Sequence, residues 1–200
     1  MIKAIIFDWG GVLIKNPAEG LINFCAKRLK VKPELLKKEY RKYEKKFQKG
    51  VIKEKILWKN ICNELSIPFP KKLLWGKAVK NVFKDNREIY SIVKKLKKKG
   101  YKLGFLSNTE LPAKRYFFEK NYNRFFDVMV FSCDKKLVKP QLQIFHLILK
   151  KLKVKPSETI FVDDNELYVR ASCNSGIKGI VFKNEKKLLK DFSNLGVKIK

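Results

Sequence analysis

Short runs of apolar, β-branched and aromatic residues recur along the chain and predict strands that are buried on both faces. They cover residues 3–7, 101–106, 126–131, 159–162 and 179–182. Between these runs the apolar positions repeat at helical spacing over residues 87–99, over residues 141–152 with Pro140 in the first turn, and in a segment after Asp164. Strands that alternate with helices of this length predict a doubly wound α/β fold with a parallel sheet.

One long segment, residues 16–85, departs from this alternation because it contains no strand pattern. Its apolar positions predict basic amphipathic helices over residues 18–29, 33–49, 53–65 and 71–83. Gly50 and the stretch Pro68–Phe69–Pro70 supply the breaks between helices. We therefore predict an α/β core built from residues 1–15 and 86–200, with residues 16–85 inserted as a helical cap.

The composition agrees with one globular unit that carries an inserted subdomain, since 45% of the 200 residues are hydrophobic. No apolar stretch reaches the roughly 18 residues of a membrane-spanning helix. The apolar run at the N-terminus is short and is interrupted by Asp8, so no secretory signal is predicted. The cysteines form no CxxC pair, which disfavours a zinc site. We therefore predict a cytoplasmic protein without a membrane partner.

The formal net charge of +28 raises the question of a nucleic-acid partner. However, the lysines are spread along the whole chain, and lysine greatly outnumbers the arginine that favours base readout. No zinc finger or other recognition motif accompanies the charge. We interpret the charge as a solvated surface that steers anionic substrates, and we do not predict nucleic-acid binding.

Polar residues follow the predicted strands, where the carboxyl ends of a parallel sheet collect ligands. They are Asp8 with Gly10 and Gly11, Ser107 with Asn108, Lys139 before Pro140, and Asp163 with Asp164. Asp8 and Asp164 are suited to share one Mg²⁺ ion, which prefers a few carboxylates together with water and substrate phosphate. Ser107 and Lys139 supply a hydroxyl and a positive charge to a phosphoryl group, and the two glycines let the backbone approach it.

The motifs FDWGGVL, LSN, KP and FVDD, in this order, resemble the four motifs of the haloacid dehalogenase-like (HAD) hydrolase superfamily. The resemblance covers essentially the whole chain, and the segment at 16–85 lies where this family carries its C1 cap. Residues 47–58 also resemble the cap of a subgroup that contains sugar-phosphate phosphatases and the epoxide hydrolase N-terminal phosphatase domain. The resemblance implies a Mg²⁺-dependent phosphatase that acts on a small phosphorylated metabolite through an aspartyl-phosphate intermediate.

Position by position, the resemblance implies that Asp8 is the nucleophile and a Mg²⁺ ligand. It further implies roles in metal binding for the Gly10 carbonyl, Asp164 and Asp163, the last through water or as a hydrogen-bonding partner. In the same way it implies that Ser107 and Lys139 hold the phosphoryl group beside the Gly10–Gly11 backbone, and that Asn108 orients the substrate or its loop.

Gly10 departs from the family pattern, because most phosphatases of this type carry a second aspartate at that position as general acid and base. Such help is typically worth about 10²–10⁴-fold in rate. Two alternatives therefore stay open, namely a HAD-like binding or regulatory protein of low turnover and a haloacid dehalogenase. The dehalogenases also lack the second aspartate, but they are metal-free, whereas the Asp163–Asp164 pair favours a cation and hence phosphate chemistry.

Overall fold

The structure is a computed structural model that describes residues 1–199, and it contains a five-stranded sheet. The strands are β1 (Ala4–Phe7), β2 (Lys102–Ser107), β3 (Val128–Phe131), β4 (Thr159–Asp163) and β5 (Lys178–Val181). Their order across the sheet is β3-β2-β1-β4-β5, and every neighbouring pair is parallel. The prediction of a doubly wound α/β class is confirmed. The winding reverses between β1 and β4, which is where such sheets bind ligands.

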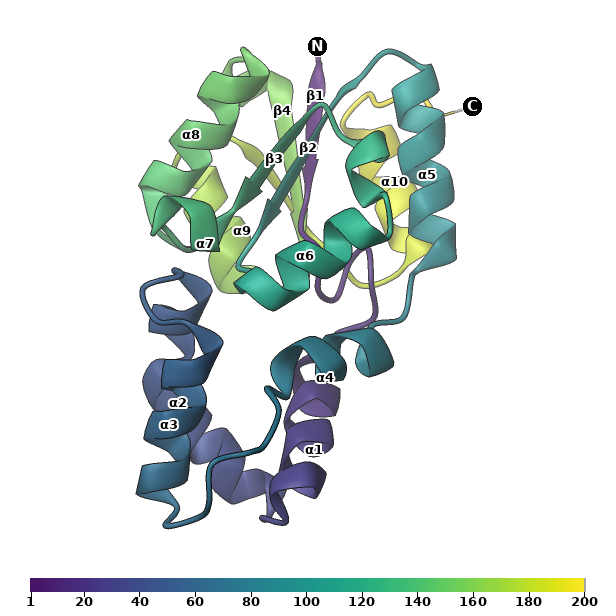
Figure 1. The fold of residues 1–200 in the computed structure, drawn as a ribbon. Helices are drawn as coiled ribbons and strands as arrows, with labels where there is room; N and C mark the ends of the chain where they lie inside the picture. Colours follow the sequence, from purple (N-terminus) through teal and green to yellow (C-terminus); the bar gives the residue numbers. More distant parts are fainter. Residues whose placement is uncertain (200) are drawn as a thin grey trace.

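Helices cover both faces of this sheet (Figure 1). On one face lie α8 (Leu142–Leu152) and α9 (Glu166–Cys173), and on the other lie α5 (Arg87–Lys98) and α10 (Glu185–Asn194). Alternate residues of β1 serve the two faces, because Ala4 and Ile6 belong to the core cluster under α8 and α9, whereas Ile5 and Phe7 belong to the cluster on the other face. This two-sided burial explains the unbroken apolar runs of the strands.

Three α-helices of the core were not predicted, and one helix begins later than predicted. The unpredicted helices are α6 (Leu111–Glu119), α7 (Ser132–Lys135) and α10. Helix α8 begins at Leu142, so Pro140 precedes that helix and does not lie in its first turn. The turn between Lys139 and the helix is instead closed by Gln141, whose side chain accepts the backbone N–H of Val138 at 3.0 Å.

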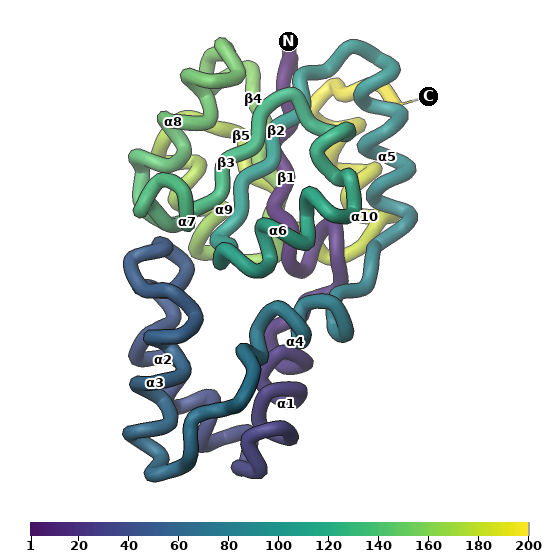
Figure 2. Tube along the Cα trace, in the orientation of Figure 1, coloured from purple at the N-terminus to yellow at the C-terminus, as the bar shows by residue number. Residues whose placement is uncertain are grey.

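Four helices between β1 and α5 lie together beyond the carboxyl edge of the sheet (Figures 1 and 2). They are α1 (Ala18–Leu29), α2 (Pro33–Gln48), α3 (Glu54–Glu64) and α4 (Trp75–Val82), and we call them the helical insert. The last begins at Trp75 and not at residue 71, because the Glu54 carboxylate accepts the Trp75 backbone N–H at 2.6 Å and fixes the first turn. Within residues 1–199, every helix is too short or too polar to cross a membrane.

The helical insert joins the core through a neck in which the outgoing and returning chains pair. Lys15 donates its backbone N–H to Lys84 at 2.9 Å, and Asn86 donates to Leu13 at 2.9 Å. Beside the neck, the buried ring of Trp9 packs edge-on against Phe83 at 5.0 Å between ring centroids. Since Trp9 follows Asp8 directly, the same contacts anchor the insert and the loop that carries Asp8.

Candidate active site

Three carboxylates meet where the carboxyl ends of β1 and β4 lie side by side. Asp8 follows β1, Asp163 ends β4, and Asp164 comes next, and the pairing of Phe7 with Val162 brings them to the same level of the sheet. One ligand oxygen from each lies within 4.8 Å of the others. Asp8 and Asp163 are buried and Asp164 is half-buried, so the sequence prediction that distant acidic residues converge agrees with the structure.

Lys139 reaches into this group with a side chain that is 1% exposed. Its Nζ lies 2.7 Å from Oδ1 of Asp8 and 2.5 Å from Oδ2 of Asp163. Burial acts to lower the pKa of Lys139, but the carboxylates of Asp163 and Asp8 outweigh burial and hold the pKa above its usual value. The side chain therefore places a permanent positive charge against the Asp8 carboxylate.

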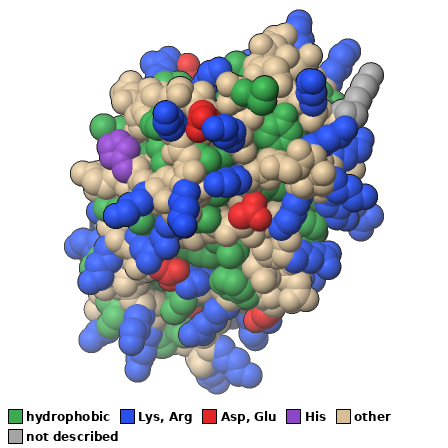
Figure 3. Space-filling model, turned by 90° about the horizontal axis from the view of Figure 1, so that it is seen from above, with side chains coloured by type: hydrophobic (Ala, Val, Ile, Leu, Met, Phe, Trp, Pro, Cys, Tyr) green, Lys and Arg blue, Asp and Glu red, His purple; other side chains and the backbone are tan. Residues whose placement is uncertain are grey.

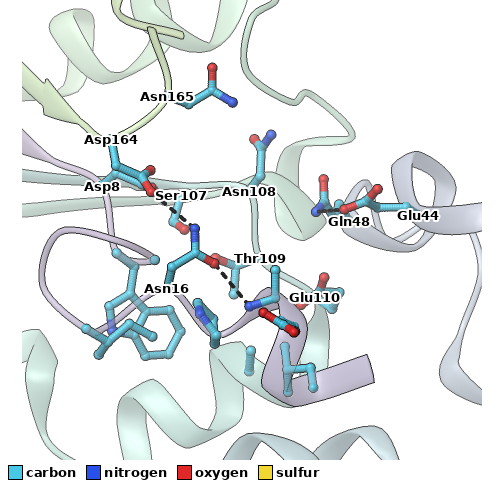
Figure 4. A pocket seen from close by; sticks show the side chains of 18 of the residues that line it. Asp8, Asn16, Glu44, Gln48, Ser107, Asn108, Thr109, Glu110, Asp164 and Asn165 are labelled. Atoms are coloured by element: carbon cyan, nitrogen blue, oxygen red, sulfur yellow. Dashed lines mark hydrogen bonds between the residues drawn. The ribbon is translucent and has the colours of Figure 1, made fainter. Parts of the chain in front are cut away.

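Asp163 and Asp164 use their carboxylates differently although they are adjacent. Oδ1 of Asp163 accepts the backbone N–H of Asn165 at 2.8 Å, and its Oδ2 accepts from Lys139, so both oxygens are engaged within the protein. Oδ2 of Asp164 accepts a weaker hydrogen bond, at 3.2 Å, from the side chain of Asn16 (Figure 4). Asp163 is thus arranged to hold Lys139, and Asp164 is the more available of the two as a ligand.

The charges of this group are not balanced, and a divalent cation would neutralise the excess negative charge. Three carboxylates and one ammonium leave two negative charges in a buried volume. The pKa of Asp8 is raised to about 7, because burial, the largest effect, and the charge of Asp163 together outweigh the opposing charge of Lys139. Oδ1 of Asp8 is buried and accepts no hydrogen bond of good geometry. An all-oxygen donor set of this charge matches the preference of Mg²⁺.

The glycine pair after Asp8 has two different structural roles. Gly11 has a φ of +79°, and a Cβ there would lie 2.0 Å from Oδ2 of Asp164, so this position requires glycine. At Gly10 a Cβ would lie 3.4 Å from the side chain of Pro17, which is an ordinary contact. The absence of an acidic side chain at Gly10 is therefore not imposed by lack of space at Cβ.

Ser107 and Asn108 stand at the end of β2, beside Asp8. Ser107 is 4% exposed and lines the same cavity as Asp8, Gly10, Lys139 and Asp164. Asn108 holds the backbone of Lys139 from both sides: its Oδ1 accepts the Lys139 N–H at 2.8 Å, and its Nδ2 donates to the Lys139 carbonyl at 3.1 Å. The predicted residues thus form one site, in which Asn108 orients the Lys139 loop.

The site opens into a cavity of about 900 Å³ between the strand ends and the helical insert. In Figure 4, Asp8, Ser107 and Asp164 lie at one end, and Glu44 and Gln48 of α2 lie at the other. Tyr40 and Trp75 of the insert also line the cavity, and their rings are stacked with 4.8 Å between the ring centroids. These residues were not predicted from the sequence, because nothing in their spacing shows which faces of α2 and α4 turn toward the core.

Glu110 is a buried carboxyl in the same cavity, and it too was not predicted. It is 7% exposed, and its Oε1 accepts a hydrogen bond from the Tyr40 hydroxyl at 3.2 Å. Burial raises the pKa of Glu110 to about 7, although its hydrogen bonds oppose the shift. The only sequence signal was its position three residues after Ser107, within the loop that follows β2.

The chain is similar to known hydrolases over most of its length. A family model described as haloacid dehalogenase-like hydrolase matches residues 2–170. The sesquiterpene phosphatase astK of Aspergillus oryzae is 26% identical over 89% of this chain and 88% of that protein. Bifunctional epoxide hydrolase 2 of Rattus norvegicus is 23% identical over 97% of this chain, which spans 39% of that protein. The chain spans less than half the length of the first curated relatives that it matches.

Solved structures share the architecture of this chain. A HAD family enzyme from Bacteroides thetaiotaomicron, solved as a magnesium complex, superposes with a TM-score of 0.79 at 22% identity, and the match covers 98% of this chain and 99% of that one. At this level of identity the similarity shows that the two chains share a fold.

We predict that Gly11→Ala weakens Mg²⁺ binding by about tenfold or more, because the new methyl group displaces the Asp164 carboxylate in addition to straining the backbone. Isothermal titration with Mg²⁺ measures the change. The matched control is Gly100→Ala, where φ is +82° but nothing lies within 4 Å of the added Cβ. Equal Mg²⁺ affinity in both variants and in the wild type would contradict the close approach of Gly11 to Asp164.

We predict that Glu110→Gln changes how stability depends on pH. A carboxyl whose pKa rises from 4.5 to about 7 on folding binds more protons in the native state, so the wild type loses stability as pH rises through this window. Relative to the variant, the wild type is expected to lose about 2 kcal/mol of unfolding free energy between about pH 5 and about pH 8. Urea unfolding of both proteins measures the difference, and Glu34→Gln, at an exposed position, should show no such change.

Proposed function

This chain belongs to the haloacid dehalogenase-like hydrolase family, and from that membership we propose that it is a magnesium-dependent phosphatase. It hydrolyses a small phosphorylated metabolite through an aspartyl-phosphate on Asp8. One observation carries the proposal: the oxygens of Asp8, Asp163 and Asp164 lie within 4.8 Å of one another beside the buried ammonium of Lys139. A relative named as a phosphatase and structural neighbours solved with magnesium and inorganic phosphate support it.

The residues proposed to hold the magnesium ion are Asp8 and Asp164 through their carboxylates and Gly10 through its carbonyl oxygen. Asp163, whose oxygens bind Lys139 and the Asn165 N–H, supports the site as a hydrogen-bonding partner. When bound, Mg²⁺ neutralises negative charge on the phosphoryl oxygens and favours the ionised form of Asp8. This assignment leaves Lys139 free to act on the substrate.

In the proposed reaction the Asp8 carboxylate attacks phosphorus. An O–P bond to Asp8 forms as the ester O–P bond breaks, and the electron pair of the broken bond leaves with the alcohol oxygen. Lys139 and the hydroxyl of Ser107 stabilise the phosphoryl oxygens, and both are fixed before substrate arrives, since each is almost fully buried. Water then attacks the aspartyl-phosphate, which releases inorganic phosphate and restores Asp8.

Proton transfer is the step for which this site is least equipped. Gly10 supplies no acid, and His146, the only histidine of the chain, is exposed on α8 and does not line the cavity. Glu110 is a carboxyl of the cavity whose pKa is about 7, but its Oε1 already accepts the Tyr40 hydroxyl. The proposed source of the proton for the departing alcohol is therefore water or the substrate itself. Phosphate esters of acidic alcohols, which leave without prior protonation, should be the better substrates.

We propose that residues 16–85 act as a cap that closes the cavity and selects the leaving group. The cavity wall opposite Asp8 belongs to α2 and α4, and it offers the Tyr40 phenol, the Gln48 amide and the Trp75 ring to a substrate. Exclusion of water strengthens the electrostatic interactions at the phosphoryl end.

The alternatives from the sequence analysis receive less support. A haloacid dehalogenase that works without a metal would bring its carboxylate substrate to a site that already has two unbalanced negative charges. A polyanion-binding protein would need its charge gathered in one area. On the face shown in Figure 3, lysine and arginine side chains are instead scattered among the other residues.

We predict that Asp8→Asn abolishes phosphate release from an aryl phosphate, with a loss of at least about 10³-fold, because an amide is not a competent nucleophile. A malachite green assay in the presence of Mg²⁺ measures the rate. Excess chelator should abolish the activity of the wild type, and Asp191→Asn on α10, remote from the cavity, should leave it unchanged. Full activity of the Asp8→Asn variant, or of the wild type in excess chelator, would refute the proposed mechanism.

We predict that Gly10→Asp raises the rate on alkyl phosphates by about tenfold or more relative to Gly10→Asn, because only the aspartate provides a proton. On an aryl phosphate with an acidic leaving group the two variants should differ little. The asparagine variant controls for the bulk of the side chain, for which the backbone leaves room at Cβ. A rate difference of the same size on both classes of ester would show that proton supply is not the missing element.

A further inference from the structure

We propose that Ser132 is a positioning residue that couples the seating of helix α2 to the loop of residues 107–110, which we call the substrate loop. This inference rests on the proposed phosphatase function, because the substrate loop carries Ser107. Ser132 is the first residue of α7 (Ser132–Lys135) and is fully buried. It does not line the cavity and belongs to none of the motifs identified in the sequence.

The hydroxyl of Ser132 bridges two segments that are far apart in sequence. Its oxygen accepts the backbone N–H of Thr109 at 2.8 Å, and it donates to the backbone carbonyl of Gln48 at 2.6 Å. Gln48 is the last residue of α2, and Thr109 lies in the substrate loop. One buried hydroxyl therefore joins the helical insert to the substrate loop. The Thr109 carbonyl, at 3.4 Å from the Ser132 oxygen, is a second and weaker acceptor, so losing Gln48 exchanges a short hydrogen bond for a long one.

A second bridge joins the same helix to the same loop. The hydroxyl of Tyr40, two turns earlier in α2, donates to the carboxyl of Glu110 at 3.2 Å. Tyr40, Gln48, Thr109 and Glu110 all line the cavity. The cavity is therefore walled by both sides of each bridge, so that the proposed coupling links the shape of the cavity to the contact between insert and core.

The end of α2 is seated closely enough on α7 to require a glycine. Gly50 has a φ of +67°, and a Cβ there would lie 2.5 Å from the carbonyl oxygen of Cys133. The contact therefore has a defined position and is not a loose approach of two surfaces. When α2 moves away from this seat, the Ser132 hydroxyl loses the Gln48 acceptor and turns its proton toward the more distant Thr109 carbonyl, which disturbs the geometry in which Ser132 holds the Thr109 N–H.

The position of the substrate loop also affects Lys139, which faces Asp8. Asn108, adjacent to Thr109, holds the backbone of Lys139 through two hydrogen bonds. Movement of the loop thus displaces Ser107 and also loosens the lysine that faces Asp8. The coupling makes the site fully formed only when α2 is seated, which restricts phosphoryl transfer to the closed state.

Hydrogen–deuterium exchange tests the coupling without any need for activity. Gly50→Ala presses on the Cys133 backbone and unseats α2, while Ser132 and Thr109 both remain in the chain, so the coupling predicts faster exchange in residues 47–52 and also in residues 107–110. An effect of about tenfold corresponds to one buried hydrogen bond. Gly100→Ala, with the same sign of φ but open space around its Cβ, is the matched control. Faster exchange confined to residues 47–52 would overturn the proposal.

Kinetics with an aryl phosphate provide the second test. Ser132→Ala is expected to lower kcat/KM about tenfold. In combination with Gly50→Ala it should add little, because both changes break one connection. Ser132→Thr keeps the hydroxyl and should recover most of the activity. Ser172→Ala, an equally buried serine that donates to Val169 within its own helix, should change little. Additive losses would refute the coupling. An inactive wild type would instead refute the proposed function, and the exchange experiment would still stand.

Discussion

The ion pairs of Lys139 with Asp8 and Asp163 are the interaction on which the rest of the site depends. A buried charge is tolerated only when it is paired, so the three side chains fix one another and, with them, the ends of β1 and β4 and the loop after α7. Asn108 adds the end of β2 through the Lys139 backbone. The lysine that we propose as a ligand of the phosphoryl group therefore also holds four segments of the core in place.

The remaining features of the molecule follow from where this group lies. The reversal of winding between β1 and β4 opens a crevice at the carboxyl ends of these strands. Just beyond this crevice the chain leaves the core and enters the helical insert, through the neck next to Trp9. The position of the neck is therefore sufficient to place α2 and α4 of the insert over the crevice. The fold thus brings the carboxylates at the strand ends and side chains of the helical insert to opposite walls of one cavity.

The sequence was sufficient for features that depend on local pattern. Buried strands show as apolar runs, and Asp8, Ser107, Lys139 and Asp164 each stand directly at or near a strand end, so the sheet alone predicts that they meet. Tyr40, Glu110 and Ser132 depend on which face of a helix turns toward which loop, and that is decided by packing between segments more than 60 residues apart in sequence. The start of α4 was missed for the same reason, since Glu54 of another helix fixes it.

The register of the central strand has a consequence for the order in which the molecule can assemble. Ala4 pairs with Lys102 on one side and with Thr159 on the other, so β1 has no partner nearby in the sequence. Closing such long loops costs conformational entropy before any pairing is gained. During synthesis, β1 can gain its first partner only when β2 has emerged from the ribosome, and its second only when β4 has emerged. Asp8 is therefore synthesised long before Lys139, Asp163 and Asp164. The group of charged side chains around it can form only when β4 pairs with β1.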